Sequence, residues 1–325
     1  MKIKFSGENF VTDKKFIESI SENDIKGLAE ADSKGFLMAP GEDAESYRKR
    51  LLVMDESYSE VEKELCSSDS YNIFGEFTID TSKRISPEIL GEAAELTQRY
   101  YGFNIDWVPG FFLSKSLGVL WGGCAISFPD QNQLSIFIIR ANFAKKKRWL
   151  FYRRDELLAH ELCHVARVPV RDRTFEELFA YRLSPSPLRR YMGNCFRHDY
   201  DAILFILPVF LLLGMQILRL FFGLDQKIPI WPFWILAGIY PLFLMLRNHF
   251  NRYIFFSAKT NLEKAGMPEP LPILFRSNGD ELKKISSLKD SNELRKWLDE
   301  KAGDELRWKV IKFRFFPKNE TRSVS

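Results

Sequence analysis

The sequence predicts an α+β fold whose core is followed by a two-helix membrane hairpin. Short strand-like segments rich in Ile, Phe and Trp precede a helical pattern containing the stretch His160-Glu161-Leu162-Cys163-His164. Two long uncharged runs follow, and charged helical patterns occupy both ends of the 325-residue chain. We therefore expect four parts: a helical N-terminal region at residues 1–82, a core at 83–198, a hairpin at 199–249 and a C-terminal region at 250–325.

The overall charge is nearly balanced, since 47 Lys and Arg against 43 Asp and Glu give +4. With no basic stripe carrying interleaved aromatic residues, this balance argues against a nucleic-acid partner. The four Cys at positions 66, 124, 163 and 195 show no paired spacing, which fits a reducing compartment rather than a disulfide framework. A long charged helix is expected at residues 42–66, and the N-terminal region carries no catalytic motif.

The core is expected to begin with a helix at Pro87–Tyr101, where apolar residues recur at helical spacing. Strands are predicted at three segments separated by Gly, Pro and Asn turns: residues 105–113, Gly123–Phe128 and residues 133–143. A hairpin loop is expected at residues 129–132. A further helix is predicted at residues 149–168, and it is apolar nearly all round, so we expect it to be mostly buried.

This last helix carries an HExxH motif, in which His160 and His164 are four residues apart and share one face. Both imidazoles can therefore reach one metal ion, with Glu161 beside them to take a proton from metal-bound water. A mostly buried helix needs partners for three polar groups, and a metal ion supplies them. The alternative is an ordinary amphipathic helix whose His pair is exposed or hydrogen-bonded in the core. We interpret Cys163 as a small buried apolar residue.

A third metal ligand is expected downstream, because zinc in hydrolases usually takes three protein ligands and keeps one open position. A short second helix is predicted between Thr174 and Tyr181, and it carries Glu176 and Glu177. The alternative role for Glu177 is structural: if Thr174 caps the helix, Glu177 completes a capping box.

HExxH followed by a Glu on a second helix resembles the gluzincin metallopeptidases, over about residues 85–185. In that family a Glu followed three residues later by Ala is a recurring form of the glutamate helix, and Glu177 and Ala180 match it. The resemblance implies a zincin-like core with one zinc ion per chain, held by His160, His164 and Glu177. Glu176 is the second choice for the third ligand.

Membrane gluzincins of the CAAX-endopeptidase and heat-shock type often continue this motif with Ala-Asp, where the present chain has Tyr181. The hydrogen bond to a ligand His must then come from another carboxylate or carbonyl. In such folds the strand before the active-site helix is an edge strand that binds extended peptide, and Leu134–Arg140 would be that strand, or else a plain sheet strand. Four side chains are candidates for stabilising an oxyanion: Tyr181, Arg182, Tyr191 and His198.

The two uncharged runs predict a transmembrane hairpin. The first span is expected at about residues 202–222, with Arg219 near its end, and the second at residues 228–246. Each is close to the roughly 20 residues that cross a bilayer as a helix. The alternatives are a shallow hairpin that enters one leaflet and a buried helical hairpin of a soluble protein.

Positive charge predicts the orientation of this hairpin. Eight Lys and Arg lie in the flanks, residues 182–197 and 247–264, whereas the connecting loop offers Lys227, with Arg219 at the end of the first span. The positive-inside rule therefore places both soluble parts, and with them the active site, in the cytosol.

The C-terminal region is expected to be a small α+β unit, with helices at residues 280–287 and 292–301 and a strand at 308–316. Taken together, the sequence predicts a membrane-anchored zinc metallopeptidase that acts on peptide or protein substrates, with Glu161 as general base. A membrane scaffold or binding protein that uses the same fold without catalysis is the alternative, and a metal-free structural adaptor is the third.

Overall fold

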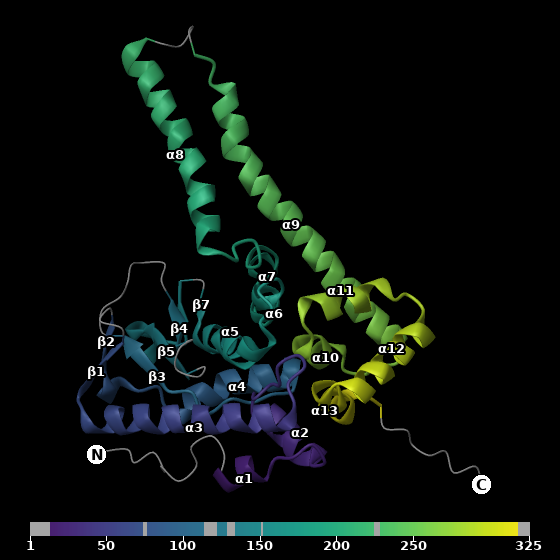
Figure 1. The fold of residues 1–325 in the computed structure, drawn as a ribbon. Coiled ribbons are helices and arrows are strands. Elements are labelled where there is room, and N and C mark those ends of the chain that lie inside the picture. Colours follow the sequence, from purple (N-terminus) through teal and green to yellow (C-terminus); the bar gives the residue numbers. More distant parts are fainter. Residues whose placement is uncertain are drawn as a thin grey trace.

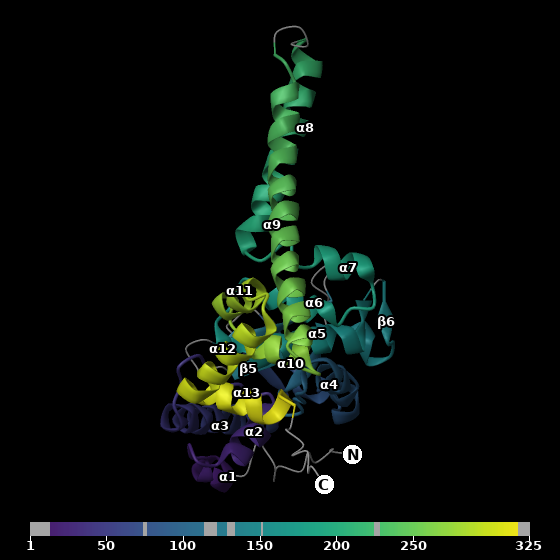
Figure 2. The same ribbon diagram turned by 90° about the vertical axis from the view of Figure 1, so that its right-hand side faces the viewer.

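A computed structural model describes residues 14–73, 77–113, 122–128, 134–150, 152–223 and 228–317. These residues form helices and small sheets, so the predicted α+β class is confirmed. A rounded body carries the sheets and most helices, and a long helical arm projects from it (Figure 1). In the perpendicular view the two arm helices overlap and extend away from the body together (Figure 2).

The N-terminal region is mainly helical, as predicted, with α1 (Lys14–Ser19), α2 (Ile25–Ser33) and α3 (Ala44–Ser67). The Asp43 side chain caps α3 by accepting a hydrogen bond from the Ser46 amide. The buried residues of α3 recur every three or four positions, which explains why this charged segment packs as a helix: Tyr47, Leu51, Met54, Tyr58, Val61 and Leu65. The antiparallel pair β1 (Ser70–Ile73) and β2 (Phe77–Asp80) was not predicted.

The central sheet has the strand order β3-β5-β4, built from β3 (Gly110–Leu113), β4 (Gly123–Phe128) and β5 (Leu134–Arg140). The prediction that Leu134–Arg140 is an edge strand is wrong, because β5 pairs parallel with β3 and antiparallel with β4. Four consecutive β5 residues are fully buried, as expected for a strand covered on both faces: Ile136, Phe137, Ile138 and Ile139. The edge strands are β3 and β4.

Helix α4 (Pro87–Tyr101) has the predicted bounds and is followed by Gly102, whose φ of 69° is the left-handed conformation that suits glycine. Helix α5 (Arg154–Arg167) begins later than predicted. The strands β6 (Arg148–Trp149) and β7 (Tyr152–Arg153) form a tight hairpin before it, and Leu150 has a positive φ of 51°. The short 3-10 helices are η1 (Thr81–Lys83), η2 (Ala141–Ala144) and η3 (Val168–Val170).

The C-terminal region is helical throughout its described residues, with α10 (Pro270–Arg276), α11 (Gly279–Ser287), α12 (Ser291–Asp304) and α13 (Leu306–Phe315). The prediction of a strand at residues 308–316, and of an α+β C-terminal unit, is therefore wrong. Trp308, Ile311 and Phe315 are buried at a spacing of three and four residues, which is the period of a helix face. This region packs back on the N-terminal helices, where Asp32 of α2 forms ion pairs with Arg276 and Arg314.

The arm consists of α8 (Asp199–Phe222) and the first half of α9 (Trp231–Lys264) (Figure 1). Among the described residues one helical segment, Tyr200–Phe222, is long and apolar enough to cross a membrane. At the base of the arm the buried Asp201 carboxylate joins the two helices. It accepts hydrogen bonds from the Tyr240 hydroxyl at 2.6 Å and from Arg247 Nη2 at 2.7 Å. The loop residues predicted at 129–132 and 224–227 lie outside the described residues.

Candidate metal centre

Helix α5 and the short helix α6 (Glu176–Arg182) bring the three predicted ligands together. His160 and His164 are one turn apart on α5, and their Nε2 atoms are 3.1 Å apart. Glu177 reaches them from α6, with Oε2 at 3.5 Å from His160 Nε2 and Oε1 at 3.6 Å from His164 Nε2. All three side chains are partly exposed, so the cluster is open to solvent on one side.

The donor set of this cluster fits a zinc ion. Ligand atoms held about 2.0–2.1 Å from a tetrahedral zinc lie about 3.4 Å apart. The two imidazole nitrogens are separated by nearly this distance, and each of them lies nearly this far from one of the two Glu177 oxygens. Two imidazoles and one carboxylate also match the ligand chemistry of hydrolytic zinc sites, which leave one position for water. The three side chains can therefore hold Zn²⁺ without a large rearrangement.

Glu176, the second choice for the third ligand, takes a different position from Glu177. Its Oε1 lies 3.3 Å from His164 Nδ1, the ring nitrogen that faces away from the cluster, and its Oε2 lies 3.2 Å from Arg167 Nε. Glu176 thus occupies the place of the orienting carboxylate that the sequence left unassigned. The capping-box alternative for Glu177 is wrong, because α6 begins at Glu176 after Phe175 and has no side-chain cap.

Glu161 projects from α5 toward the edge strand β4. Its carboxylate accepts a hydrogen bond of 2.9 Å from the backbone amide of Ala125, and the side chain is buried. This contact holds the Glu161 carboxylate next to the edge strand β4, on the same helix as the two His side chains. Burial raises the pKa of Glu161.

Burial and mutual charge also set the protonation of the cluster. Burial, with further contributions from His164 and Arg189, holds the pKa of His160 well below its usual range. For His164 burial acts in the same direction, but the hydrogen bond with Glu176 and the charge of Glu177 outweigh it and raise the pKa to about 9. Burial raises the pKa of Glu177 to about 7. The two carboxylates therefore favour the protonated form of His164, and a cation bound to its ring nitrogen would compete with that proton.

Of the four predicted oxyanion candidates, Tyr181 is the one that contacts the cluster. Its ring meets the His160 ring edge-on, with centroids 4.5 Å apart. The other three have contacts elsewhere: Arg182 lies over Phe255 and Phe256, Tyr191 lies under Arg252, and His198 stacks on Tyr200.

Two neighbours of Tyr181 were missed by the sequence analysis. The guanidinium of Arg189, on α7 (Pro187–Met192), lies 5.8 Å from the centre of the Tyr181 ring and pairs with Glu156 of α5 at 2.5 Å. Gly193 follows α7 and packs directly on the same ring, because a Cβ there would lie 2.1 Å from a ring atom. No motif marks Arg189 or Gly193, so their place in the site comes from the turn of the chain after α6.

No protein-family model, no curated protein and no solved structure matches this chain. The resemblance to gluzincins therefore stays a prediction that depends on the residues described above.

Proposed function

We propose that this protein is a zinc-dependent metallopeptidase with a zincin-like core. The observation that carries the proposal is the convergence of His160 Nε2, His164 Nε2 and a Glu177 carboxylate oxygen within 4.8 Å of one another. Bound zinc would lower the pKa of a coordinated water and polarise the scissile carbonyl. The chain would bind one zinc ion through these three side chains.

The remaining steps belong to residues of this chain. Glu161, held by the Ala125 amide, takes a proton from the attacking water and delivers it to the leaving amine. Tyr181 is our first choice for a donor to the developing oxyanion. Burial raises the pKa of its hydroxyl to about 12, so the hydroxyl keeps its proton at neutral pH. The positive charge of Arg189 nearby favours the same developing negative charge.

We further propose that the arm anchors the enzyme in a bilayer. Tyr200–Phe222 would form one span, and the apolar start of α9 would return as the second. The positive charge on both flanks then favours a cytosolic active site, with the loop near residue 225 on the other side. A peptide or protein is the expected substrate, and the bilayer is the expected partner.

The decisive experiment is the Glu161→Gln variant of the full chain in detergent. Zinc content is measured by elemental analysis, and hydrolysis is measured with a quenched fluorescent peptide library. We expect about one zinc per chain in both proteins and hydrolysis only in the wild type, because coordination does not need Glu161 and proton transfer does. Equal hydrolysis by the two proteins would contradict the mechanism. Zinc without hydrolysis in the wild type would favour the non-catalytic scaffold.

The ligand assignment has its own controls. His160→Ala and His164→Ala should each remove the zinc, and Glu177→Ala should weaken zinc binding more than Glu176→Ala. Full zinc occupancy in both His variants would leave the metal-free adaptor as the remaining interpretation.

A further inference from the structure

A buried arginine connects the metal centre to the C-terminal helices. Arg167 is the last residue of α5, one turn beyond His164, and its side chain is fully buried. A buried guanidinium needs several partners to offset its loss of hydration. Two of these partners are carboxylates: Glu176 Oε2, 3.2 Å from Arg167 Nε, and Asp172 Oδ2, 3.0 Å from Nη2.

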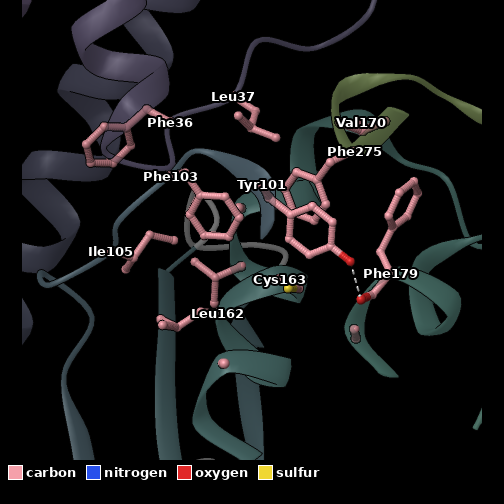
Figure 3. Close-up of a cluster of buried hydrophobic side chains, with 14 of the residues drawn as sticks. Phe36, Leu37, Tyr101, Phe103, Ile105, Leu162, Cys163, Val170, Phe179 and Phe275 are labelled. Atoms are coloured by element: carbon pink, nitrogen blue, oxygen red, sulfur yellow. Dashed lines mark hydrogen bonds between the residues drawn. The ribbon is translucent and has the colours of Figure 1, made fainter. Parts of the chain in front are cut away.

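The other partners of Arg167 come from the C-terminal region. Its Nη1 donates a close hydrogen bond to the carbonyl of Phe275 at the end of α10 and lies 3.5 Å from the carbonyl of Ser277. The guanidinium also packs on the Phe179 ring at 4.4 Å and on the Phe275 ring at 5.3 Å. Figure 3 shows Phe275 beside Tyr101 and near Phe179, in the buried cluster that also contains Cys163 of α5. Residues about a hundred positions away in sequence therefore fix this side chain.

Glu176 passes this constraint on to the metal centre. One of its oxygens is engaged by Arg167, and the other lies 3.3 Å from His164 Nδ1. The orientation of a ligand His depends on the hydrogen bond at its other ring nitrogen. Displacing Arg167 would move Glu176, and the His164 ring would then lose the hydrogen bond that orients it.

The start of α11 supports the same arrangement from the side of Asp172. Gly279 packs so closely there that a Cβ would lie 3.1 Å from Asp172 Oδ1. The same carboxylate oxygen accepts a hydrogen bond from the Thr174 amide, and Thr174 leads into α6. A larger side chain at position 279 would therefore push on the carboxylate that pairs with Arg167.

We propose that residues 270–279 lock the metal centre through Arg167 and Glu176, so that zinc affinity and geometry depend on the C-terminal helices. Glu176 and Arg167 are positioning residues in this proposal, and His164 is the ligand on which they act. The inference depends on the zinc site of the proposed function, and it assigns a role to a region that carries no motif.

The test uses the full chain in detergent and measures two properties. Zinc affinity is measured by competition with a chelating dye, and the coordination geometry is measured from the visible absorption of the Co²⁺-loaded protein. Glu176→Ala should weaken zinc binding about 10–100-fold, the usual cost of losing such a partner. Glu176→Gln should weaken zinc binding less than Glu176→Ala does, because its amide oxygen can still accept from the His164 ring while its NH2 group, itself a donor, faces the Arg167 N–H.

The remote variant is Gly279→Val, with Gly303→Val as its matched control, because a Cβ at Gly303 meets no atom within 4 Å. We expect Gly279→Val to weaken zinc binding and change the Co²⁺ spectrum, and Gly303→Val to leave both unchanged. Gly279→Ala is the milder variant if valine prevents folding, which far-UV circular dichroism reports.

The outcomes separate this proposal from the proposed function. If the wild type binds zinc and the folded Gly279 variants match it in affinity and spectrum, the proposed dependence on residues 270–279 is wrong, and the zinc site of the proposed function is unaffected. If the wild type binds no zinc, the assignment of the metal centre is wrong, and the proposed dependence on residues 270–279 is overturned with it.

Discussion

Gly193→Ala tests how tightly Tyr181 is packed beside the candidate metal centre. A Cβ at this position would lie 2.1, 2.2 and 2.6 Å from three atoms of the Tyr181 ring. Carbon atoms in contact are about 3.5–4.0 Å apart, so the ring must move by more than about 1 Å. The backbone of Gly193 is right-handed helical, with φ −57° and ψ −34°, and accepts alanine without strain. The cost therefore comes from packing, and the three nearest atoms all belong to the Tyr181 ring.

Overpacking of this kind costs about 1–3 kcal/mol of unfolding free energy. In a Tyr181→Ala background the space is empty, and Gly193→Ala should cost nothing or stabilise slightly, since alanine restricts the unfolded chain. The double-mutant cycle should thus give a coupling energy of about 1–3 kcal/mol. Chemical unfolding in detergent, followed by tryptophan fluorescence, measures each corner of the cycle. Gly91→Ala on α4, where a Cβ meets nothing within 4 Å, is the control.

The same variant bears on catalysis, because the Tyr181 ring lies against His160. A misplacement of about 1 Å near reacting groups can cost about 10²-fold in rate, so we expect a loss of that order in hydrolysis by Gly193→Ala. An equal destabilisation by Gly193→Ala in the wild-type and Tyr181→Ala backgrounds would refute the reasoning. A coupling energy near zero, together with full hydrolytic activity of the Gly193→Ala variant, would also refute it.

Three further predictions concern the arm and the metal. Asp201→Ala leaves Arg247 without its carboxylate partner and should destabilise the protein by about 3–5 kcal/mol, whereas Tyr240→Phe, which removes one hydrogen bond, should cost about 1 kcal/mol. Equal shifts of the melting temperature for the two variants, measured by thermal unfolding in detergent, would contradict this prediction. Removing zinc with a chelator should lower the melting temperature, and added zinc should restore it, because the ion binds the folded state; an unchanged melting temperature would argue against the metal site. The orientation is tested with single cysteines in a background without native Cys: cysteine at position 225 should react with an impermeant thiol reagent on intact cells, and cysteine at position 290 only after permeabilisation. Reaction of position 290 on intact cells would reverse the orientation, and reaction of neither position would favour the shallow hairpin.

The sequence by itself determined the features that depend on local spacing. His160 and His164 share a face because they are four residues apart on a helix, whatever surrounds them. The apolar run of α8 follows from composition, and the bounds of α4 follow from Pro87 at its start and Gly102 after its end. These features can be predicted from the sequence because each depends on residues that are close to one another along the chain.

The tertiary structure decided what depends on distant partners. Strand β5 is central because β3 and β4 both pair with it. The residue pattern of one strand shows which of its faces are buried, but it does not show which other strands pair with it. The segment at residues 308–316 alternates like a strand, yet it buries a helical face against α2, α10 and α12.

The positions of the two adjacent glutamates also depend on tertiary packing. The sequence ranked Glu177 above Glu176 only through the resemblance to the glutamate helix. The packing of α6 on α5 places Glu177 against both His Nε2 atoms, and Glu176 between His164 Nδ1 and Arg167. Tyr181, Arg189 and Gly193 meet because the chain turns back after α6, and Phe275 reaches Arg167 from a hundred residues away. Such contacts depend on how packed elements fit together, and no local pattern of residues records that fit.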